Sequence, residues 1–155
     1  MKKLLWIIPI AIVCAITYYY IYGKEQSIVV ASDCCPHATI YLQPYDNFSQ
    51  KEAETLKAEL DRHLVNIIND ALKVIVLPNK TLSDSFLGET GKKYRVDKII
   101  DSLKYNTDEH NIYIGITHHD ICREYKNGVK DWGVLGTSIP IYNACVVSDH
   151  RLKHK

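Results

Sequence analysis

The sequence has almost no net charge. Lysine and arginine together number 19 against 18 acidic residues, which gives a formal net charge of +1 at pH 7. A surface that binds nucleic acid, or a polyacidic partner, needs a clear local excess of positive charge. The composition therefore argues against nucleic acid as a partner.

Several short catalytic signatures are also missing. The 155 residues contain no Gly-x-Ser-x-Gly segment for a nucleophilic serine and no Cys-x-x-Cys pair for zinc, and the 7 glycines form no phosphate-binding series. No local cysteine and histidine signature of a thiol hydrolase is present either. These motifs therefore give no support to nucleophilic or phosphate chemistry.

Phenylalanine is scarce, with 2 residues, whereas tyrosine is abundant, with 11. The apolar content of 46% and the charged content of 24% nevertheless match those of a globular protein. A length of 155 residues suits one domain of ordinary size. We therefore expect a single folded domain behind the N-terminal segment.

The N-terminal segment has the character of a membrane anchor. Residues 4–22 carry no charge and follow Lys2 and Lys3, and such a run is about long enough to cross a hydrocarbon layer of ~30 Å. Because positive residues stay on the cytoplasmic side, the domain is expected on the extracytoplasmic side. A cleaved signal peptide is the alternative, although bulky tyrosines follow the small residues that a cleavage site would use.

The chain accordingly divides into three expected parts. Residues 1–23 form the signal anchor or transmembrane helix, residues 24–37 a tether without a clear hydrophobic period, and residues 38–155 the folded domain. Four cysteines lie outside the anchor, at positions 34, 35, 122 and 145. In an oxidising compartment the neighbouring pair would bridge to Cys122 and Cys145, and buried free thiols are the other interpretation.

The first half of the domain predicts a strand, a helix and a second strand. Residues 38–42 form the first strand, and Ser49 with Glu52 makes a capping box that starts a helix with an apolar stripe as far as Leu72. The uninterrupted apolar run 74–77 is typical of an interior parallel strand. Together these elements predict a right-handed crossover unit.

The second half predicts another crossover and two further strands. A polar surface excursion over 81–93 leads to a short helix over 94–106, and a third strand follows at 112–116. The fourth and fifth strands are expected at 132–135 and 144–147. The predicted fold is α/β, with a mixed, partly parallel sheet and two packed helices.

Two adjacent histidines, His118 and His119, follow the third strand together with Asp120. Consecutive side chains on a strand point to opposite faces, so this pair is a poor metal chelate. We interpret these residues as solvated strand-end residues, with Asp120 forming a turn or cap; a hydrolase site around the three is an alternative. His150 and His154 have helical i, i+4 spacing but lack the glutamate of a zinc peptidase.

Three short motifs follow one another in the second half of the domain. They are Ile114-Gly-Ile-Thr-His-His-Asp-Ile121, Asp131-Trp-Gly-Val-Leu-Gly136, and Ala144-Cys-Val-Val-Ser148 followed by Arg151-Leu152. The order of these loose motifs resembles the archaemetzincin family of zinc metallopeptidases. Upstream, Leu77-Pro78 and the segment from Tyr94 to Leu103 are also similar to the family. The resemblance spans roughly residues 38–152 and implies the N-terminal, metzincin-like subdomain of such an enzyme.

In that family a helix with His-Glu-x-x-His and a further histidine binds the catalytic zinc and comes after the Arg-Leu segment. The 155 residues contain no His-Glu-x-x-His. The resemblance therefore carries over no catalytic residue, no metal ligand and no cofactor in this chain. We expect an incomplete, membrane-anchored portion of an archaemetzincin-like peptidase that does not hydrolyse peptides as it stands.

What the resemblance does imply is the substrate side of the site. Such peptidases bind an extended substrate along an edge strand, and the matching residues are Gly133, Val134, Leu135 and Gly136. A short edge with glycines leaves amide and carbonyl groups open to an added strand. An extended peptide or a partner chain is therefore the expected ligand, and a noncatalytic extracytoplasmic peptide- or protein-binding module is the alternative function.

Overall fold

The computed structural model describes residues 39–64, 73–103, 111–124, 128–139 and 142–153. The expected anchor, the tether, Cys34 and Cys35 lie outside these ranges. Within the described ranges, no helix combines the length and the apolar character needed to cross a membrane.

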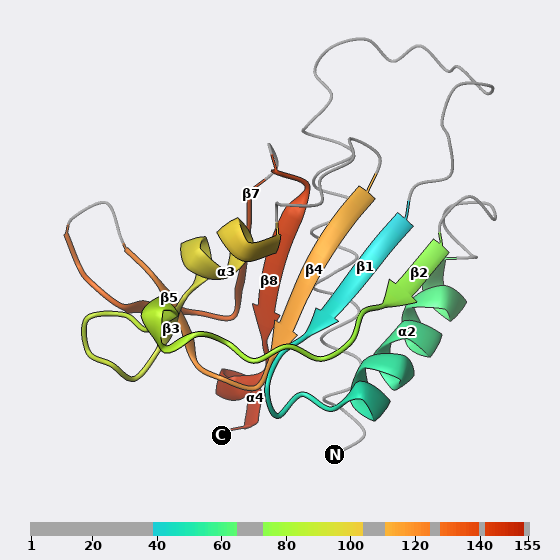
Figure 1. The fold of residues 1–155 in the computed structure, drawn as a ribbon, viewed down its shortest axis with the longest axis horizontal. Helices are drawn as coiled ribbons and strands as arrows, with labels where there is room; N and C mark the ends of the chain where they lie inside the picture. Colours follow the sequence, from blue (N-terminus) through green and yellow to red (C-terminus); the bar gives the residue numbers. More distant parts are fainter. Residues whose placement is uncertain (1–38, 65–72, 104–110, 125–127, 140–141, 154–155) are drawn as a thin grey trace, which may run out of the picture.

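The main body is a five-stranded mixed sheet (Figure 1). Its strands are β1 (Thr39–Pro44), β2 (Lys73–Val76), β4 (Asn111–Thr117), β7 (Gly136–Ile139) and β8 (Ala144–Ser148). The spatial order is β2-β1-β4-β8-β7. The first four strands in this order run parallel, and β7 runs antiparallel to β8 at one edge. The predicted α/β class and the mixed, partly parallel sheet are therefore confirmed.

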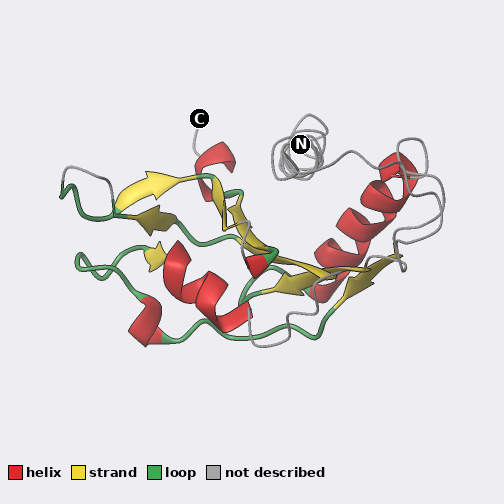
Figure 2. Ribbon diagram, turned by 90° about the horizontal axis from the view of Figure 1, so that it is seen from above, coloured by secondary structure: helices red, strands yellow, loops and turns green. Residues whose placement is uncertain are grey.

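Two helices cover opposite faces of the sheet: α2 (Gln50–Leu64) and α3 (Val96–Leu103). Figure 2 shows them on the two sides of the twisted sheet. The predicted capping box begins α2, because the Ser49 amide donates to Glu52 Oε2 at 2.8 Å and the Glu52 amide donates to Ser49 Oγ at 3.2 Å. The start of the first helix is thus confirmed.

The alternation of side chains along the strands produces two apolar cores. Side chains on one face of the sheet pack against α2 and form the first core, and side chains on the other face pack against α3 and form the second. The main residues of the first core are Ile40, Leu42, Leu56, Leu60, Ile114 and Ile116; those of the second are Ile99, Ile100, Leu103, Tyr113, Ala144 and Val146. Strands β1 and β4 are thus covered on both faces, which explains their nearly continuous apolar sequences.

A second, three-stranded sheet lies beside the first. It contains β3 (Tyr94–Arg95), β5 (Ile121–Arg123) and β6 (Trp132–Val134) in the order β3-β5-β6. The prediction of a helix from residue 94 is wrong by two residues, since Tyr94 and Arg95 pair with β5 instead. The predicted strand 132–135 is also corrected, because residues 132–134 belong to the small sheet and the main sheet gains β7.

The excursion over 81–93 is not purely polar surface. It contains a short 3-10 helix, η1 (Asp84–Phe86), and Leu82 is buried in the α3 core. The last described element is a single helical turn, α4 (His150–Lys153).

Cys122 and Cys145 are free, buried thiols. Of the two interpretations of the cysteines, the described part of the chain therefore supports the free thiol for both positions. Burial disfavours the thiolate and raises the pKa of each thiol to about 12; for Cys122, the nearby Asp131 carboxylate adds to the effect.

Candidate functional site

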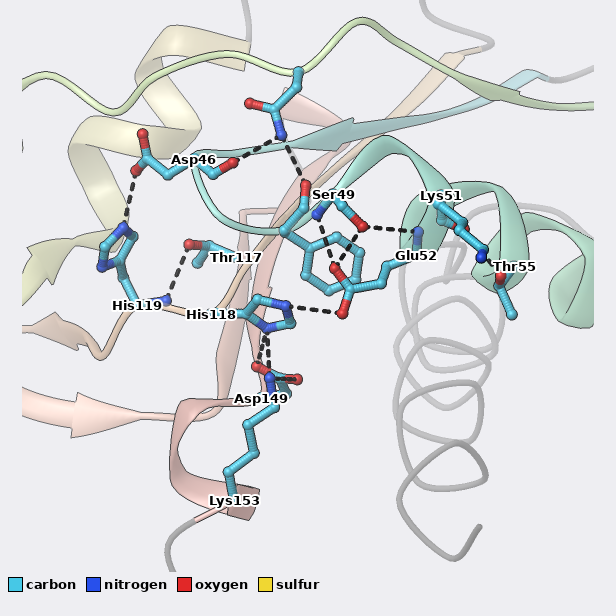
Figure 3. A network of polar contacts seen from close by, with 12 residues as sticks. Asp46, Ser49, Lys51, Glu52, Thr55, Thr117, His118, His119, Asp149 and Lys153 are labelled. Atoms are coloured by element: carbon cyan, nitrogen blue, oxygen red, sulfur yellow. Dashed lines mark hydrogen bonds and ion pairs between the residues drawn. The ribbon is translucent and has the colours of Figure 1, made fainter. Parts of the chain in front are cut away.

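The carboxyl ends of β1, β4 and β8 meet at one edge of the main sheet, because these strands are parallel neighbours. Polar residues follow each of the three ends: Asp46 after β1, His118 and His119 after β4, and Asp149 after β8. Figure 3 shows His118 between Glu52 and Asp149 near the start of α2, while Asp46 faces His119. In open α/β sheets this is the edge at which ligands commonly bind.

His118 lies at the centre of this network. Its Nδ1 is 2.6 Å from Asp149 Oδ1 and its Nε2 is 3.3 Å from Glu52 Oε1, while the ring packs on Phe48 with centroids 4.6 Å apart. The side chain is only 12% exposed. The interpretation of His118 as a solvated residue is therefore wrong, because two carboxylates and an aromatic ring enclose it.

Asp149 joins this histidine to the last helical turn. It is buried, and the Lys153 ammonium lies 3.0 Å from its Oδ2. A buried carboxylate is tolerated when cations and hydrogen-bond donors surround it. His118 and Lys153 together supply that environment, so α4 is held against the end of β4.

The Glu52 carboxylate belongs to both the capping box and the histidine contact. Partial burial opposes its ionisation, but hydrogen bonds from the Ser49 hydroxyl and amide, and the nearby His118, leave its pKa below the ordinary value. Glu52 is therefore ionised at neutral pH.

His119 turns to a different partner. Its Nε2 is 3.0 Å from Asp46 Oδ2, and its ring is 4.9 Å from that of Tyr94. Asp46 Oδ1 accepts a hydrogen bond from the Leu82 amide at 3.1 Å. The two adjacent histidines thus bind separate carboxylates on either side of the strand end, as Figure 3 shows.

Among the residues that the structure describes, no group of three or more His, Cys, Asp and Glu side chains is arranged to hold a metal ion. A catalytic zinc needs three protein donors around one point. The nitrogens of His118 and His119 instead face carboxylates in different places. The described residues do not fit the zinc centre that the family resemblance implies.

Asp120 forms neither a cap nor a solvated turn. Its carboxylate binds the Arg151 guanidinium in a two-point pair, with Nε to Oδ1 at 2.9 Å and Nη2 to Oδ2 at 3.1 Å. The same guanidinium lies against Gly133 of β6, where a Cβ atom would overlap Nη2. Arg151 therefore joins three segments that are distant in sequence.

The predicted edge residues are divided between the two sheets. Gly133 and Val134 lie in β6, Leu135 lies in the bend, and Gly136 begins β7. In the spatial orders of the strands, β6 is the last strand of the small sheet and β7 the last strand of the main sheet. Of the four residues, only Gly136 therefore lies on the edge strand of the main sheet. That strand, β7, continues to Ile139.

Asp131 is an organising residue that sequence reasoning missed. It is buried and accepts hydrogen bonds from the Thr90 amide at 2.8 Å and from Cys122 Sγ at 3.5 Å. The Thr90 contacts outweigh partial desolvation and lower the pKa of Asp131. A Cβ atom at Gly88 would overlap the Asp131 carboxylate, so glycine is required there. In the sequence, the structural role of Asp131 is indicated only by Gly88 and Asp131 taken together, and neither residue alone indicates it.

The order of the main sheet, its antiparallel edge strand and the two covering helices define a mixed α/β fold. The structure is similar to two solved archaemetzincins. One, from Archaeoglobus fulgidus complexed with malonate, is 24% identical over 74% of this chain and 62% of its own, with a TM-score of 0.53. The other, from Methanopyrus kandleri, is 18% identical over 76% of this chain and 61% of its own, with a TM-score of 0.56.

The resemblance to archaemetzincins is thus confirmed at the level of the fold. This chain spans about three fifths of the length of either solved protein. No protein-family model matches the sequence, and no curated protein is significantly similar to it.

Proposed function

We propose that this chain is the peptide-binding portion of an archaemetzincin-like peptidase, held at the membrane and inactive as it stands. The observation that carries the proposal is the outer edge of β7, which is the last strand of the main sheet among the described residues and runs antiparallel to its neighbour. An extended peptide can add to such an edge through main-chain hydrogen bonds.

The alternation of main-chain hydrogen bonds along β7 identifies the amide and carbonyl groups that a peptide would use. The Ser148 amide donates to the Leu135 carbonyl at 2.8 Å, and these two residues are opposite each other in the register that β7 and β8 follow. In an antiparallel pair the main-chain groups alternate in direction. Thr137 and Ile139 therefore face β8, whereas Gly136 and Ser138 point their amides and carbonyls outward.

The surroundings of these outward groups suit an extended ligand. Within the described ranges, Gly136 and Ser138 make no backbone hydrogen bond on the outer side, and both residues are exposed. Trp132 and Leu135, which precede β7, are 53% and 48% exposed. Large apolar side chains beside an open strand edge provide contacts for the side chains of a bound peptide.

The described residues contribute no metal chemistry to this proposal. The ring nitrogens of His118 and His119 lie against carboxylates, and no His-Glu-x-x-His occurs in the 155 residues. A zinc ion that served this sheet would need ligands from other residues. The same facts favour the second candidate, a noncatalytic extracytoplasmic module that binds a peptide or protein partner.

Peptide addition is tested by the substitution Ser138→Pro in the full chain, purified in detergent micelles. Proline removes one outward amide without removing an amide that faces β8. We expect binding of a labelled, unstructured peptide pool to weaken about tenfold or more, measured by fluorescence anisotropy. Ser138→Ala is the matched control, because it keeps the amide and should bind as the wild type does.

Equal affinity of the proline and alanine variants would contradict edge binding. A wild-type chain that binds no member of the peptide pool would contradict the proposed function as a whole.

Membrane attachment is a separate part of the proposal and rests on the uncharged run at residues 4–22 behind Lys2 and Lys3. The full chain should stay in the membrane pellet after alkaline carbonate extraction, and external protease should digest its domain. A chain that begins at Gly23 is the control and should be extracted. Release of the full chain by carbonate would contradict the anchor.

A further inference from the structure

The Arg151 guanidinium of α4 lies between Asp120 and the backbone of Gly133, and it thereby connects α4 to both sheets. On one side it makes the two-point ion pair with Asp120, at the turn between β4 and β5. On the other side it lies so close to the Gly133 backbone that a Cβ atom there would overlap Nη2 and Cζ. A planar, weakly hydrated guanidinium is suited to both contacts at once.

Gly133 lies two residues before the bend at Leu135 that leads into the proposed peptide edge. It pairs with Cys122 in the small sheet, and Leu135 then hydrogen-bonds to Ser148 at the start of the main-sheet ladder. Ser148 lies two positions before the first residue of α4, and its hydroxyl donates to the His119 carbonyl at 2.5 Å. Both sides of the bend at Leu135 are therefore attached to the short stretch from Ser148 to Arg151.

We propose that Arg151 is a positioning residue for the β7 edge. By holding Gly133 against the Asp120 pair, it fixes the direction in which the chain enters β7 and so the direction of the outward groups of Gly136 and Ser138. The part of this inference that concerns peptide binding rests on the proposed function. The contact of Arg151 with Gly133 and Asp120 can be tested without any peptide.

The contact requires glycine at 133 and arginine at 151 together. A side chain at Gly133 would displace the guanidinium, which can move because its side chain is flexible and 40% exposed. Lysine at 151 would keep the charge but would lose the planar, two-point geometry. Gly133→Ala and Arg151→Ala should therefore cause the same defect, and the second substitution should add little to the first.

The first measurement is hydrogen–deuterium exchange of the full chain in detergent micelles, followed by mass spectrometry. Arg151→Lys and Arg151→Ala should each speed exchange in the segment 132–139 by about fivefold to tenfold, because a charge-assisted two-point pair is lost. Exchange in α2 should not change. Arg62→Ala, which removes an exposed ion pair with Glu59 on α2, is the matched control.

The second measurement is a double-mutant cycle on peptide affinity with Gly133→Ala, Arg151→Ala and the combined variant. We expect each single variant to bind about fivefold to tenfold more weakly and the combined variant to equal the weaker single one. Independent, multiplying effects would overturn the inference.

The exchange result separates this inference from the proposed function. Wild-type exchange rates over 132–139 in Arg151→Ala would overturn the positioning role even if peptides bind. Faster exchange in a chain that binds no peptide would support the positioning role while removing the proposed function.

Discussion

At the scale of single residues, His118 determines how the carboxyl edge of the main sheet is held together. It contacts Asp149 between β8 and α4, Glu52 from α2 and the ring of Phe48. Its 12% exposure makes these contacts less screened by water than an ordinary surface pair. His118 therefore links the start of α2 to the segment that follows β8.

Replacing His118 should destabilise the domain measurably. His118→Leu leaves the buried Asp149 carboxylate with fewer partners, which costs on the order of 1–3 kcal/mol. His119→Leu is the comparison, since His119 is 36% exposed and its loss should cost less. Thermal unfolding followed by circular dichroism measures both, and equal losses would contradict the role of His118.

The two buried thiols predict a defined chemical behaviour. Because the pKa of both Cys122 and Cys145 is raised to about 12, little thiolate exists in the folded protein at pH 8. Iodoacetamide should label neither residue before unfolding and both after unfolding in urea, as read by mass spectrometry. Labelling of Cys122 in the folded protein would contradict its burial.

The same shift sets the sign of a pH dependence. An unfolded thiol ionises near pH 8.5–9, whereas the folded thiols ionise near 12. Their contribution to stability is therefore complete below about pH 8.5 and is lost as pH rises toward 12. The raised pKa of Tyr45, which is due to burial, acts in the same direction.

At the scale of elements, the sequence predicted both crossovers because their signals are local. Each signal lies within 4 to 15 consecutive residues: the capping box and apolar period of α2, and the apolar runs of β2 and β4. Strands β3, β5 and β6 have 2 or 3 residues each, too few to show a period. They exist because partners distant in sequence complete their hydrogen bonds.

The start of α2 provides a test at this scale. Glu52→Gln should lower the thermal midpoint at pH 7, where the carboxylate accepts from Ser49. Since the pKa of Glu52 is lowered in the folded protein, this contribution is present above its ordinary pKa and is lost as pH falls through the lowered value. The difference from wild type should therefore shrink as pH falls through the lowered pKa of Glu52.

Glu54→Gln is the matched control for this test, since Glu54 lies on the same exposed turn of α2 but outside the capping box. It should leave the thermal midpoint close to that of the wild type. A Glu52→Gln difference that stays constant from pH 7 to pH 3 would contradict the assignment.

The candidate site was predictable only in part, for the same physical reason. The residues before β7 were identified by resemblance, but the division between β6 and β7 depends on pairing with β5 and β8. The contacts of His118 with Glu52 and Asp149 join residues 66 and 31 positions apart. No local pattern contains such separations, so the burial of His118 could not be anticipated.

At the scale of the whole molecule, the sheet order β2-β1-β4-β8-β7 leaves one antiparallel strand at the edge. The polar network lies at the carboxyl ends of β1, β4 and β8, and the Arg151 contact joins that network to the strand that leads into β7. In the described part of the chain, His118 and His119 both contact carboxylates, and the proposed peptide edge lies on β7.

The most direct test incubates the full chain in detergent micelles with a mixed peptide pool and equimolar zinc, and then identifies retained and released peptides by mass spectrometry. The account predicts that extended peptides are retained intact by the wild type and are lost from the Ser138→Pro variant. Cleaved products that disappear when 1,10-phenanthroline is added would contradict it.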